Sequence, residues 1–451
     1  MSMPHAAGND TTRASSFDAH HAPEKKYIDD CVHCGFCLPA CPTYVLWGEE
    51  MDSPRGRIYM MKSASQGRAS LDANFQMHMD NCLGCMACMT ACPSGVQYNK
   101  LIEPTRAQIE RKLPHGFSAS LFRRFLFATV PHAGRMRLLA VPLLFYQKSG
   151  LRSLVHAVGI DKLLPKRLAA MEALLPEVPR HLFSKAPTTY QPRTAPRRRV
   201  GMLSGCVQQV FFAHVNAATA RVLAAEGCEV IVPPTQECCG ALMLHSGLEA
   251  EAVSLAKKMI AVFEAAQVDT IVINSAGCGS TMKDYGYLLR DEPAWAERAA
   301  AFSAKCKDIS EILCELEPQT PRHPLKLRIA YHDACHLQHA QSVREQPRHL
   351  LASIPELDLV EIPEASLCCG SAGVYNLLNP EPAGELGRRK VDNLLTTGAE
   401  AVISANPGCL MQLMKGLRDR GMKAMPAFHM VELLDASQRG ISAESLLKRE
   451  A

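Results

Sequence analysis

The feature that most constrains this chain is a run of four cysteines that occurs twice between residues 31 and 92. Both copies have the spacing Cys-x2-Cys-x2-Cys-x3-Cys-Pro, which is typical of two-cluster bacterial ferredoxins. Gaps of two residues allow a tight loop to direct three thiolates toward one cluster. We therefore predict that two [4Fe–4S] clusters are bound by Cys31, Cys34, Cys37, Cys41, Cys82, Cys85, Cys88 and Cys92.

The last cysteine of each run is expected to bind the cluster of the other run, as it does in two-cluster ferredoxins. The first expected set is Cys31, Cys34, Cys37 and Cys92, and the second is Cys82, Cys85, Cys88 and Cys41. Small residues between the ligands, Gly35, Gly84 and Ala87, suit a backbone wrapped closely around sulfide. The alternative metal is zinc, but structural zinc sites usually combine two Cys-x2-Cys pairs across a longer loop. The three-cysteine turn followed by Cys-Pro therefore favours clusters.

The last part of the chain contains an internal repeat centred on the tripeptide Cys-Cys-Gly. Four cysteines of the first copy recur in the second at offsets of 129 to 131 residues. The expected strands are residues 199–203, 229–232, 270–274, 326–331, 357–362 and 401–404, with helical stretches between them. This order predicts two α/β repeats with parallel sheets, whose strands place their carboxyl ends at one edge, so the cysteines should converge. The repeated cysteines are Cys206, Cys238, Cys239, Cys278, Cys335, Cys368, Cys369 and Cys409.

Two roles are open for these eight repeated cysteines. They could form a second redox site, either a non-cubane cluster or a thiol centre, within or between the repeats. Alternatively they are structural, because free cysteine is often buried and a following glycine can serve only a tight turn. Their recurrence at strand ends favours a functional role. Three histidines near Cys335 are either ligands or proton carriers of such a site, or hydrogen-bonded packing residues: His332, His336 and His339.

The cysteine count also bears on the compartment. Nineteen is an odd number, and residues 1–22 lack the apolar core of a secretory signal. We therefore expect metal binding in a reducing, cytoplasmic compartment rather than a disulfide framework. No apolar stretch reaches the ~18–20 residues that cross a bilayer. Cys228, Cys306 and Cys314 have no cysteine counterpart in the other repeat, so we expect them in the core.

Positive charge is concentrated in the middle of the chain. Residues 104–200 contain 18 Lys and Arg against 4 Asp and Glu, or +14, whereas the remainder carries 31 against 41, or −10. Such a segment suits an anionic partner, either a lipid surface or an acidic protein. Nucleic acid is not expected, since we find no binding motif and aromatic residues make up 6% of the chain. Phenylalanines and leucines mixed with arginines over 118–154 predict either a membrane-surface segment or helices packed on protein.

These patterns predict a multidomain chain. Residues 1–25 are expected to form a disordered tail, 26–103 an α-helical two-cluster ferredoxin domain, and 104–198 a basic helical linker broken by prolines. Residues 199–320 and 321–451 are expected to be tandem α/β Cys-Cys-Gly repeats, each with a parallel sheet.

Twin ferredoxin runs followed by two Cys-Cys-Gly domains resemble the iron–sulfur subunits of glycolate oxidase, anaerobic glycerol-3-phosphate dehydrogenase and heterodisulfide reductase. The resemblance covers the chain after residue 25. The stretches Asp52-Ser-Pro-Arg-Gly-Arg-Ile-Tyr59 and Cys92-Pro-Ser-Gly-Val-Gln-Tyr98 are most similar to bacterial glycolate oxidase. Heterodisulfide reductase domains end in Cys-x-x-Cys. The endings here are Cys278-Gly-Ser-Thr281 and Cys409-Leu-Met-Gln412, which argues against a non-cubane cluster and heterodisulfide chemistry.

The resemblance to glycolate oxidase implies a complex in which FAD-binding subunits oxidise glycolate to glyoxylate and this chain passes the electrons toward membrane quinone. It implies FAD on a partner subunit, no activity of this chain alone, and a peripheral position on the inner face of the cytoplasmic membrane. No Gly-x-Gly-x-x-Gly follows an expected strand, so we expect no dinucleotide site in this chain.

Two other functions remain open. One is an iron–sulfur subunit of a complex that acts on lactate, glycerol 3-phosphate or a disulfide. The other is an iron–sulfur scaffold or sensor without turnover. The scaffold or sensor is disfavoured, because two clusters that exchange ligands suit electron conduction, whereas a sensor needs only one labile cluster.

Overall fold

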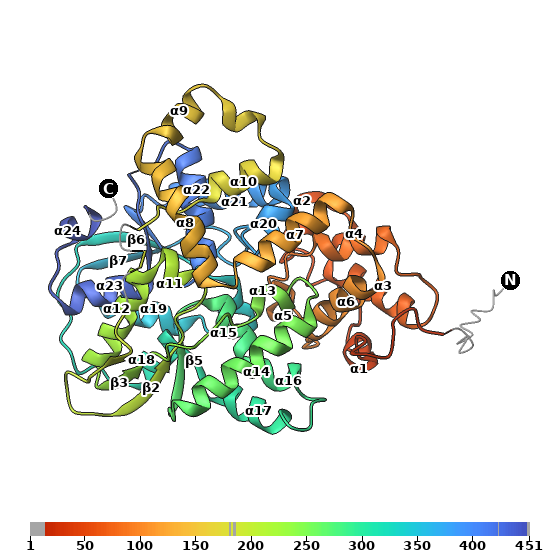
Figure 1. Cartoon of the computed structure of the whole chain (residues 1–451), viewed down its shortest axis with the longest axis horizontal. Coiled ribbons are helices and arrows are strands. Elements are labelled where there is room, and N and C mark those ends of the chain that lie inside the picture. Colours follow the sequence, from red (N-terminus) through yellow and green to blue (C-terminus); the bar gives the residue numbers. More distant parts are fainter. Residues whose placement is uncertain (1–13, 180–181, 184–185, 423, 449–451) are drawn as a thin grey trace. The chain divides into compact units, whose positions relative to one another are not determined.

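The computed structural model describes residues 14–179, 182–183, 186–422 and 424–448 of the 451 in the chain. The chain divides into two compact units. Unit 1 comprises the residues up to His115 together with His245–Leu248, and unit 2 comprises Gly116–Leu244 and the residues from Glu249 onward. Figure 1 labels the helices and strands of both units.

The described part of unit 1 is built from helices and loops. The helices are α1 (Lys25–Asp29), α2 (Pro42–Trp47), the 3₁₀ helix η1 (Glu50–Asp52), α3 (Pro54–Ser65), α4 (Ala73–Asn81), α5 (Ala87–Thr90) and α6 (Asn99–Lys112). Pro54 occupies the first turn of α3, directly after Ser53, whose side chain caps that helix. The Asp72 side chain caps α4 in the same way. Local sequence thus determines where the helices around the ferredoxin cysteines begin.

The N-terminal segment differs from the sequence-based expectation. Residues 14–24 belong to the expected disordered tail but pack within unit 1. Phe17 is buried, and its ring meets Phe75 edge to face with centroids 6.4 Å apart. The Asp18 carboxylate accepts hydrogen bonds from two side chains of α6. The tail prediction is therefore wrong for these residues, while residues 1–13 lie outside the described part of the chain.

Unit 2 begins with the basic linker, which is helical as predicted. Its helices are α7 (Phe117–Thr129), α8 (Ala133–Lys148), α9 (Leu151–Ala157), the 3₁₀ helix η2 (Ile160–Leu163) and α10 (Lys166–Leu174). The boundary expected after residue 103 lies later, because α6 of unit 1 continues to Lys112. Pro142 lies inside α8 and does not end it. Among the described residues, none of the helices combines the length and apolar character needed to cross a bilayer.

The two Cys-Cys-Gly repeats each form a parallel sheet with helices, which confirms the predicted fold class. Sheet A has the order β1-β3-β2-β4-β5 and sheet B the order β7-β6-β8-β9, and only β1 pairs antiparallel. The strands of sheet A are β1 (Thr189–Tyr190), β2 (Arg198–Met202), β3 (Cys228–Ile231), β4 (Thr270–Ile273) and β5 (Cys306–Asp308). Those of sheet B are β6 (Leu327–His332), β7 (Leu357–Glu361), β8 (Ala401–Ser404) and β9 (Ala427–His429).

Three strands were not expected from the sequence: β1, β5 and β9. They are two or three residues long, which is too short for a hydrophobic pattern to reveal. β5 runs directly into α18 (Ile309–Glu315) and β9 into α23 (Met430–Gln438), and each helix starts with a capping box formed by Asp308 or His429. Because β1 pairs with β3, the first repeat begins before the expected boundary at residue 199.

One hydrophobic core joins the two repeats. It contains Val200 and Val272 of sheet A together with Ile329 of sheet B. α12 (Ala213–Ala225) packs beside α23 (Figure 1), and Arg221 makes paired hydrogen bonds of 2.8 and 2.7 Å to the Asp435 carboxylate there.

The remaining helices of unit 2 are α11 (Gln208–Phe211), α13 (Ala241–Leu244), α14 (Glu249–Ala265), α15 (Ala276–Lys283), α16 (Tyr285–Leu288), α17 (Ala296–Lys305), the π-helix η3 (His336–Ala340), α19 (Glu345–Ala352), α20 (Tyr375–Leu378), α21 (Pro380–Leu395), α22 (Pro407–Asp419) and α24 (Ala443–Leu447).

Candidate metal centres

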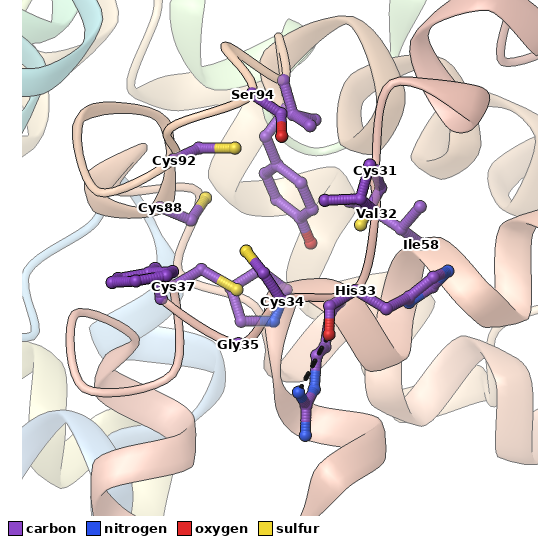
Figure 2. A pocket seen from close by; sticks show the side chains of 15 residues that line it. Cys31, Val32, His33, Cys34, Gly35, Cys37, Ile58, Cys88, Cys92 and Ser94 are labelled. Carbon is purple, nitrogen blue, oxygen red and sulfur yellow. Dashed lines mark hydrogen bonds between the residues drawn. The ribbon is translucent and has the colours of Figure 1, made fainter.

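The first expected set of ferredoxin cysteines lies together in unit 1. Site one, as we name it, consists of Cys31, Cys34, Cys37 and Cys92, which all line one pocket (Figure 2). The loop after α1 passes through left-handed backbone conformations at His33 and Gly35, with φ of 55° and 89°. A Cβ atom at Gly35 would stand 2.8 Å from Nη1 of Arg55, so a side chain there would be both strained and crowded. Cys34 is exposed, so site one is open to solvent.

The thiols of site one favour a cationic ligand. Burial raises the pKa of the Cys31 thiol, and the neighbouring Cys92 and Cys34 raise it further. Burial likewise raises the pKa of Cys37 to about 11. Several crowded thiols with raised pKa values do not ionise together in the absence of a positive charge, whereas a coordinating metal deprotonates thiols outright. The donor set therefore fits an iron–sulfur cluster.

The second expected set is more deeply buried. Site two consists of Cys41, Cys82, Cys85 and Cys88, and three of these four cysteines are buried, Cys88 being partly exposed. The pKa of Cys88 is raised well above its ordinary value, by burial first and then by Cys85, Cys82 and Cys41. Cys88 also lines the pocket of site one, so the two sites adjoin (Figure 2). Cys92 thus lies with the first run and Cys41 with the second, which is the grouping that ligand exchange requires.

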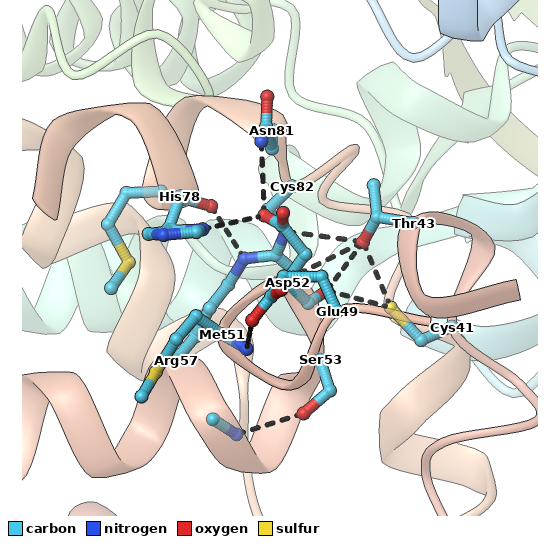
Figure 3. A network of polar contacts seen from close by, with 12 residues as sticks. Cys41, Thr43, Glu49, Met51, Asp52, Ser53, Arg57, His78, Asn81 and Cys82 are labelled. Atoms are coloured by element: carbon cyan, nitrogen blue, oxygen red, sulfur yellow. Dashed lines mark hydrogen bonds and ion pairs between the residues drawn. The ribbon is translucent and has the colours of Figure 1, made fainter. Parts of the chain in front are cut away.

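A buried polar network adjoins site two (Figure 3). The Arg57 side chain of α3 is only 1% exposed, and its guanidinium donates hydrogen bonds to Asp52 Oδ1 at 3.0 Å and Thr43 Oγ1 at 3.2 Å. It also donates to the His78 carbonyl oxygen at 2.7 Å. Thr43 Oγ1 lies 3.2 Å from the Cys41 sulfur. Sequence reasoning missed Arg57 because no spacing rule relates it to a cysteine, although it stands in the stretch that carried the family resemblance.

Several hydrogen-bond donors surround the Cys82 sulfur of site two. The Gly84 N–H donates to this sulfur at 3.3 Å, and the Tyr98 hydroxyl donates at 3.8 Å. Burial alone would raise the pKa of Cys82. The charges of Arg57 and Arg106, together with these two hydrogen bonds, outweigh burial and leave that pKa lowered. The surroundings of Cys82 therefore favour negative charge on its sulfur.

Unit 2 brings together the first Cys-Cys-Gly set. Cys206 follows β2, Cys238 and Cys239 follow β3, and Cys278 lies in the first turn of α15 just after β4. Thiol contacts join Cys206 to Cys238, Cys238 to Cys239, and Cys239 to Cys278. Gly240 adopts φ of 80°, and its N–H donates to the Cys238 sulfur at 3.4 Å. The glycine of the motif therefore both permits the turn and supplies a donor to the site.

The second Cys-Cys-Gly set is joined in the same order and lies close to a histidine. Thiol contacts run from Cys335 to Cys368, from Cys368 to Cys369, and from Cys369 to Cys409. The buried His332, at the end of β6, has a ring nitrogen within 4.8 Å of the sulfurs of Cys369 and Cys409. Each predicted convergence of four cysteines is thus present, and the second set can offer an imidazole in addition.

The other two histidines differ in what they face. His336 Nδ1 lies 3.6 Å from the Cys335 sulfur, so it also belongs to the second set. His339 Nε2 faces the Ser366 carbonyl oxygen at 3.2 Å, which fits hydrogen-bonded packing. In the first repeat Leu203 stands where His332 stands in the second, so the two sets are chemically unequal.

The cysteines without a counterpart are not all in the core. Cys228 and Cys306 are buried, as expected. Cys314 is exposed, so the expectation is wrong for this residue. It lies near the end of α18, whose buried side is formed by residues such as Ile312 and Leu313, and the helical turn carries Cys314 away from that side.

Comparisons with known families match each part of this architecture. A model described as "4Fe-4S dicluster domain" matches residues 27–96, and a model described as "Cysteine-rich domain" matches 200–283 and 329–414. A model described as "Glycolate oxidase iron-sulfur subunit, linker region" matches 118–175. Fold and sites therefore define an iron–sulfur protein with a ferredoxin-type unit and two cysteine-rich domains.

Relatives in other organisms narrow the family. The chain is 39% identical to the probable glycolate oxidase iron–sulfur subunit of Bacillus subtilis strain 168, over 90% of this chain and 93% of that protein. It is 34% identical to the glycolate oxidase iron–sulfur subunit of Escherichia coli K12, over 85% and 89%. It is 31% identical to lactate utilization protein A of Oceanobacillus iheyensis, over 54% and 98%. The chain belongs to the family of glycolate oxidase iron–sulfur subunits.

Replacing the fourth cysteine of each run should affect the site of the other run. In the anaerobically purified full chain, we expect Cys41→Ser to alter the EPR signal that Cys82→Ser alters, and Cys92→Ser to alter the signal that Cys31→Ser alters. The reason is that each of these sulfurs lies with three cysteines of the other run. Cys314→Ser, at an exposed cysteine outside both sites, should leave both signals unchanged. If Cys41→Ser instead alters the same EPR signal as Cys31→Ser, each site is bound by the four cysteines of its own run.

Proposed function

We propose that this chain holds two [4Fe–4S] clusters and conducts electrons from a flavin subunit to an acceptor. The observation that carries the proposal is the separation of the eight ferredoxin cysteines into two adjoining four-thiol sites. Four cysteine thiolates are the usual donor set of a [4Fe–4S] cluster. When bound, such clusters accept and release single electrons.

The surroundings of the two sites suit an electron path between the protein surface and its interior. Beside the exposed Cys34, the apolar side chains of Val32 and Phe36 are each 67% exposed. Exposed apolar groups around a redox site are suitable for docking a partner subunit. Site two has three buried cysteines and adjoins site one through Cys88. We propose that electrons enter or leave this unit at site one.

We propose glycolate as the substrate, oxidised to glyoxylate on FAD-binding partner subunits, with quinone as the acceptor. The match of residues 118–175 to the linker of glycolate oxidase subunits supports this choice. The similarity to glycolate oxidase subunits also extends over 85–90% of this chain, against 54% for lactate utilization protein A. Lactate is the second candidate.

The isolated chain, loaded with its clusters, should not oxidise glycolate, because iron–sulfur clusters do not accept hydride. Addition of the flavin subunits should restore glycolate-dependent reduction of a quinone analogue, at a higher rate than with lactate or glycerol 3-phosphate. The measurement is an anaerobic assay of the chain alone, the flavin subunits alone and the complex. Turnover by the chain without flavin would refute the proposal that the flavin subunits oxidise the substrate. A faster rate with lactate would identify lactate as the substrate in place of glycolate.

We also propose that the Cys-Cys-Gly sets bind metal and act as a further redox centre. Four joined thiols in each set support this, as does the buried Nδ1 of His332, which has no hydrogen-bond partner among the described residues. Thiolates with imidazole suit iron as well as zinc, and the redox role requires iron, because zinc does not change its oxidation state. The absent last cysteine of Cys-x-x-Cys in both repeats weighs against a non-cubane cluster.

Metal content tests this assignment. The variant Cys369→Ser should bind less metal per chain than the unaltered protein, while both ferredoxin-type EPR signals persist, because it removes the thiol that contacts both Cys368 and Cys409. The exposed Cys314→Ser serves as the matched control and should keep the full content. If folded Cys369→Ser and Cys239→Ser variants both retain all of their metal, these cysteines are packing residues.

We propose, finally, that the linker helices attach the complex to an anionic membrane surface on the cytoplasmic side. Large apolar side chains are exposed at three- or four-residue spacing on α7, α8 and α9: Phe117, Leu121, Phe125, Leu138, Val141, Phe145, Leu151 and Leu154. This spacing places them along one side of each helix. The surrounding segment has a charge of +14, and apolar side chains combined with basic ones suit an anionic lipid interface. An acidic partner subunit is the alternative occupant.

Vesicle sedimentation distinguishes these two occupants. The chain should sediment with anionic but not neutral vesicles at low salt, and high salt should release it. The double variant Leu138→Ser/Phe145→Ser should bind at least about tenfold more weakly, because each buried apolar side chain contributes roughly 1.5–3 kcal/mol. Met422→Ser, at an exposed apolar residue outside the linker, is the control. Absence of binding to anionic vesicles at low salt would leave the partner subunit as the occupant.

A further inference from the structure

Sites one and two differ in the positive charges beside them. At site one, Arg55 donates to the His33 carbonyl oxygen at 3.2 Å. Its side chain is 29% exposed and is paired with the Glu50 carboxylate at 2.7 Å. Water and Glu50 therefore screen the charge of Arg55. Site two has two arginines beside it: Arg57, which is buried, and Arg106, which is partly buried.

Arg57 is the more deeply buried of the two. Its guanidinium donates to Thr43 Oγ1 at 3.2 Å, and Thr43 Oγ1 lies 3.2 Å from the Cys41 sulfur of site two (Figure 3). Its carboxylate partner is Asp52, which is also buried. That carboxylate is shared, because Asn81 donates to the same Oδ1 atom at 3.1 Å. Asp52 therefore offsets part of the positive charge of Arg57 at site two.

Arg106 of α6 adds a second positive charge. Its Nη2 donates to the carbonyl oxygens of Met79, at 3.1 Å, and of Cys82. Its Nη1 donates to the His245 carbonyl oxygen at 2.9 Å. All three acceptors are neutral, so these bonds hold the guanidinium against the backbone of Cys82 without cancelling its charge.

Reduction adds one negative charge to a cluster, and burial makes that addition unfavourable because water cannot solvate it. A fixed cation in a region of low dielectric constant has the opposite effect, because its attraction for the added charge is weakly screened. Hydrogen bonds to cluster sulfurs act in the same direction as the cation. The Gly84 N–H and the Tyr98 hydroxyl supply such bonds at Cys82.

We infer that Arg57 and Arg106 raise the reduction potential of site two and so keep a buried site reducible. The inference rests on the proposed two-cluster function and assigns these arginines a role beyond holding the fold. One electron enters site two on reduction and leaves it on oxidation. No proton needs to accompany the electron, because both guanidinium groups remain charged throughout.

The test is an anaerobic redox titration of the full chain, followed by EPR, with site two identified as the signal that Cys82→Ser alters. Arg57→Gln and Arg106→Gln should each shift the midpoint of site two to lower potential and leave that of site one in place. Asp52→Asn should shift site two in the opposite direction, since it removes the opposing negative charge. Arg57→Lys should restore most of the unaltered midpoint. Arg55→Gln, two residues from Arg57 on the same helix, should leave site two unchanged.

Iron and sulfide content, measured on each variant, separates the possible failures. If the unaltered chain lacks two clusters, the proposed function fails and the inference fails with it. If both clusters are present but Arg106→Gln and Asp52→Asn leave the midpoint of site two unchanged, the inference alone is overturned. If Arg57→Gln loses the site-two cluster, the inference is still tested by Arg106→Gln and Asp52→Asn, because both variants keep the buried guanidinium of Arg57.

Discussion

Unit 1 depends on one constraint, which is that four thiols must meet at each of two points and that neither cysteine run supplies all four. Cys41 leaves its own run at the start of α2 and lies with the second run, and Cys92 leaves after α5 and lies with the first. Each site is therefore complete only when segments about fifty residues apart in sequence have packed together. The left-handed turns at Gly35 and Gly84 serve this convergence, because they let short loops direct their sulfurs inward.

The same constraint explains a buried arginine in so small a unit. An isolated buried guanidinium is unfavourable, and breaking its ion pair would leave an uncompensated charge. Arg57 is surrounded by Asp52, Thr43 and the His78 carbonyl oxygen, all within hydrogen-bond distance, and faces the sulfurs of site two. In the proposed two-cluster function the thiolates and the cluster of site two are anionic, so a permanent cation at this position would stabilise both the ligand set and the added electron. Arg57 thus has a place both in the folded network and in the proposed electron transfer.

The sequence predicts the arrangement of residues where metal binding imposes a fixed spacing on cysteines. The cysteine runs grouped the eight ferredoxin cysteines, and the offset of the Cys-Cys-Gly motifs predicted both parallel sheets and the convergence of their cysteines. The sequence does not predict positions that depend on how distant segments pack together. Arg57 becomes a neighbour of Cys82 through the folding of α3 against α4, and Phe17 is buried where its ring meets Phe75, which is distant in sequence. The strands β5 and β9 are too short to carry a hydrophobic pattern, and Cys314 faces solvent because of its place on α18.

The proposed function requires two [4Fe–4S] clusters held by exchanged cysteines. An anaerobic crystal structure of the full chain, with iron located by anomalous scattering, tests it most directly. We expect two four-iron clusters in unit 1, one bound by Cys31, Cys34, Cys37 and Cys92, and the other bound by Cys41, Cys82, Cys85 and Cys88. A single cluster, zinc in either place, or Cys41 and Cys92 each bound within its own run would contradict it.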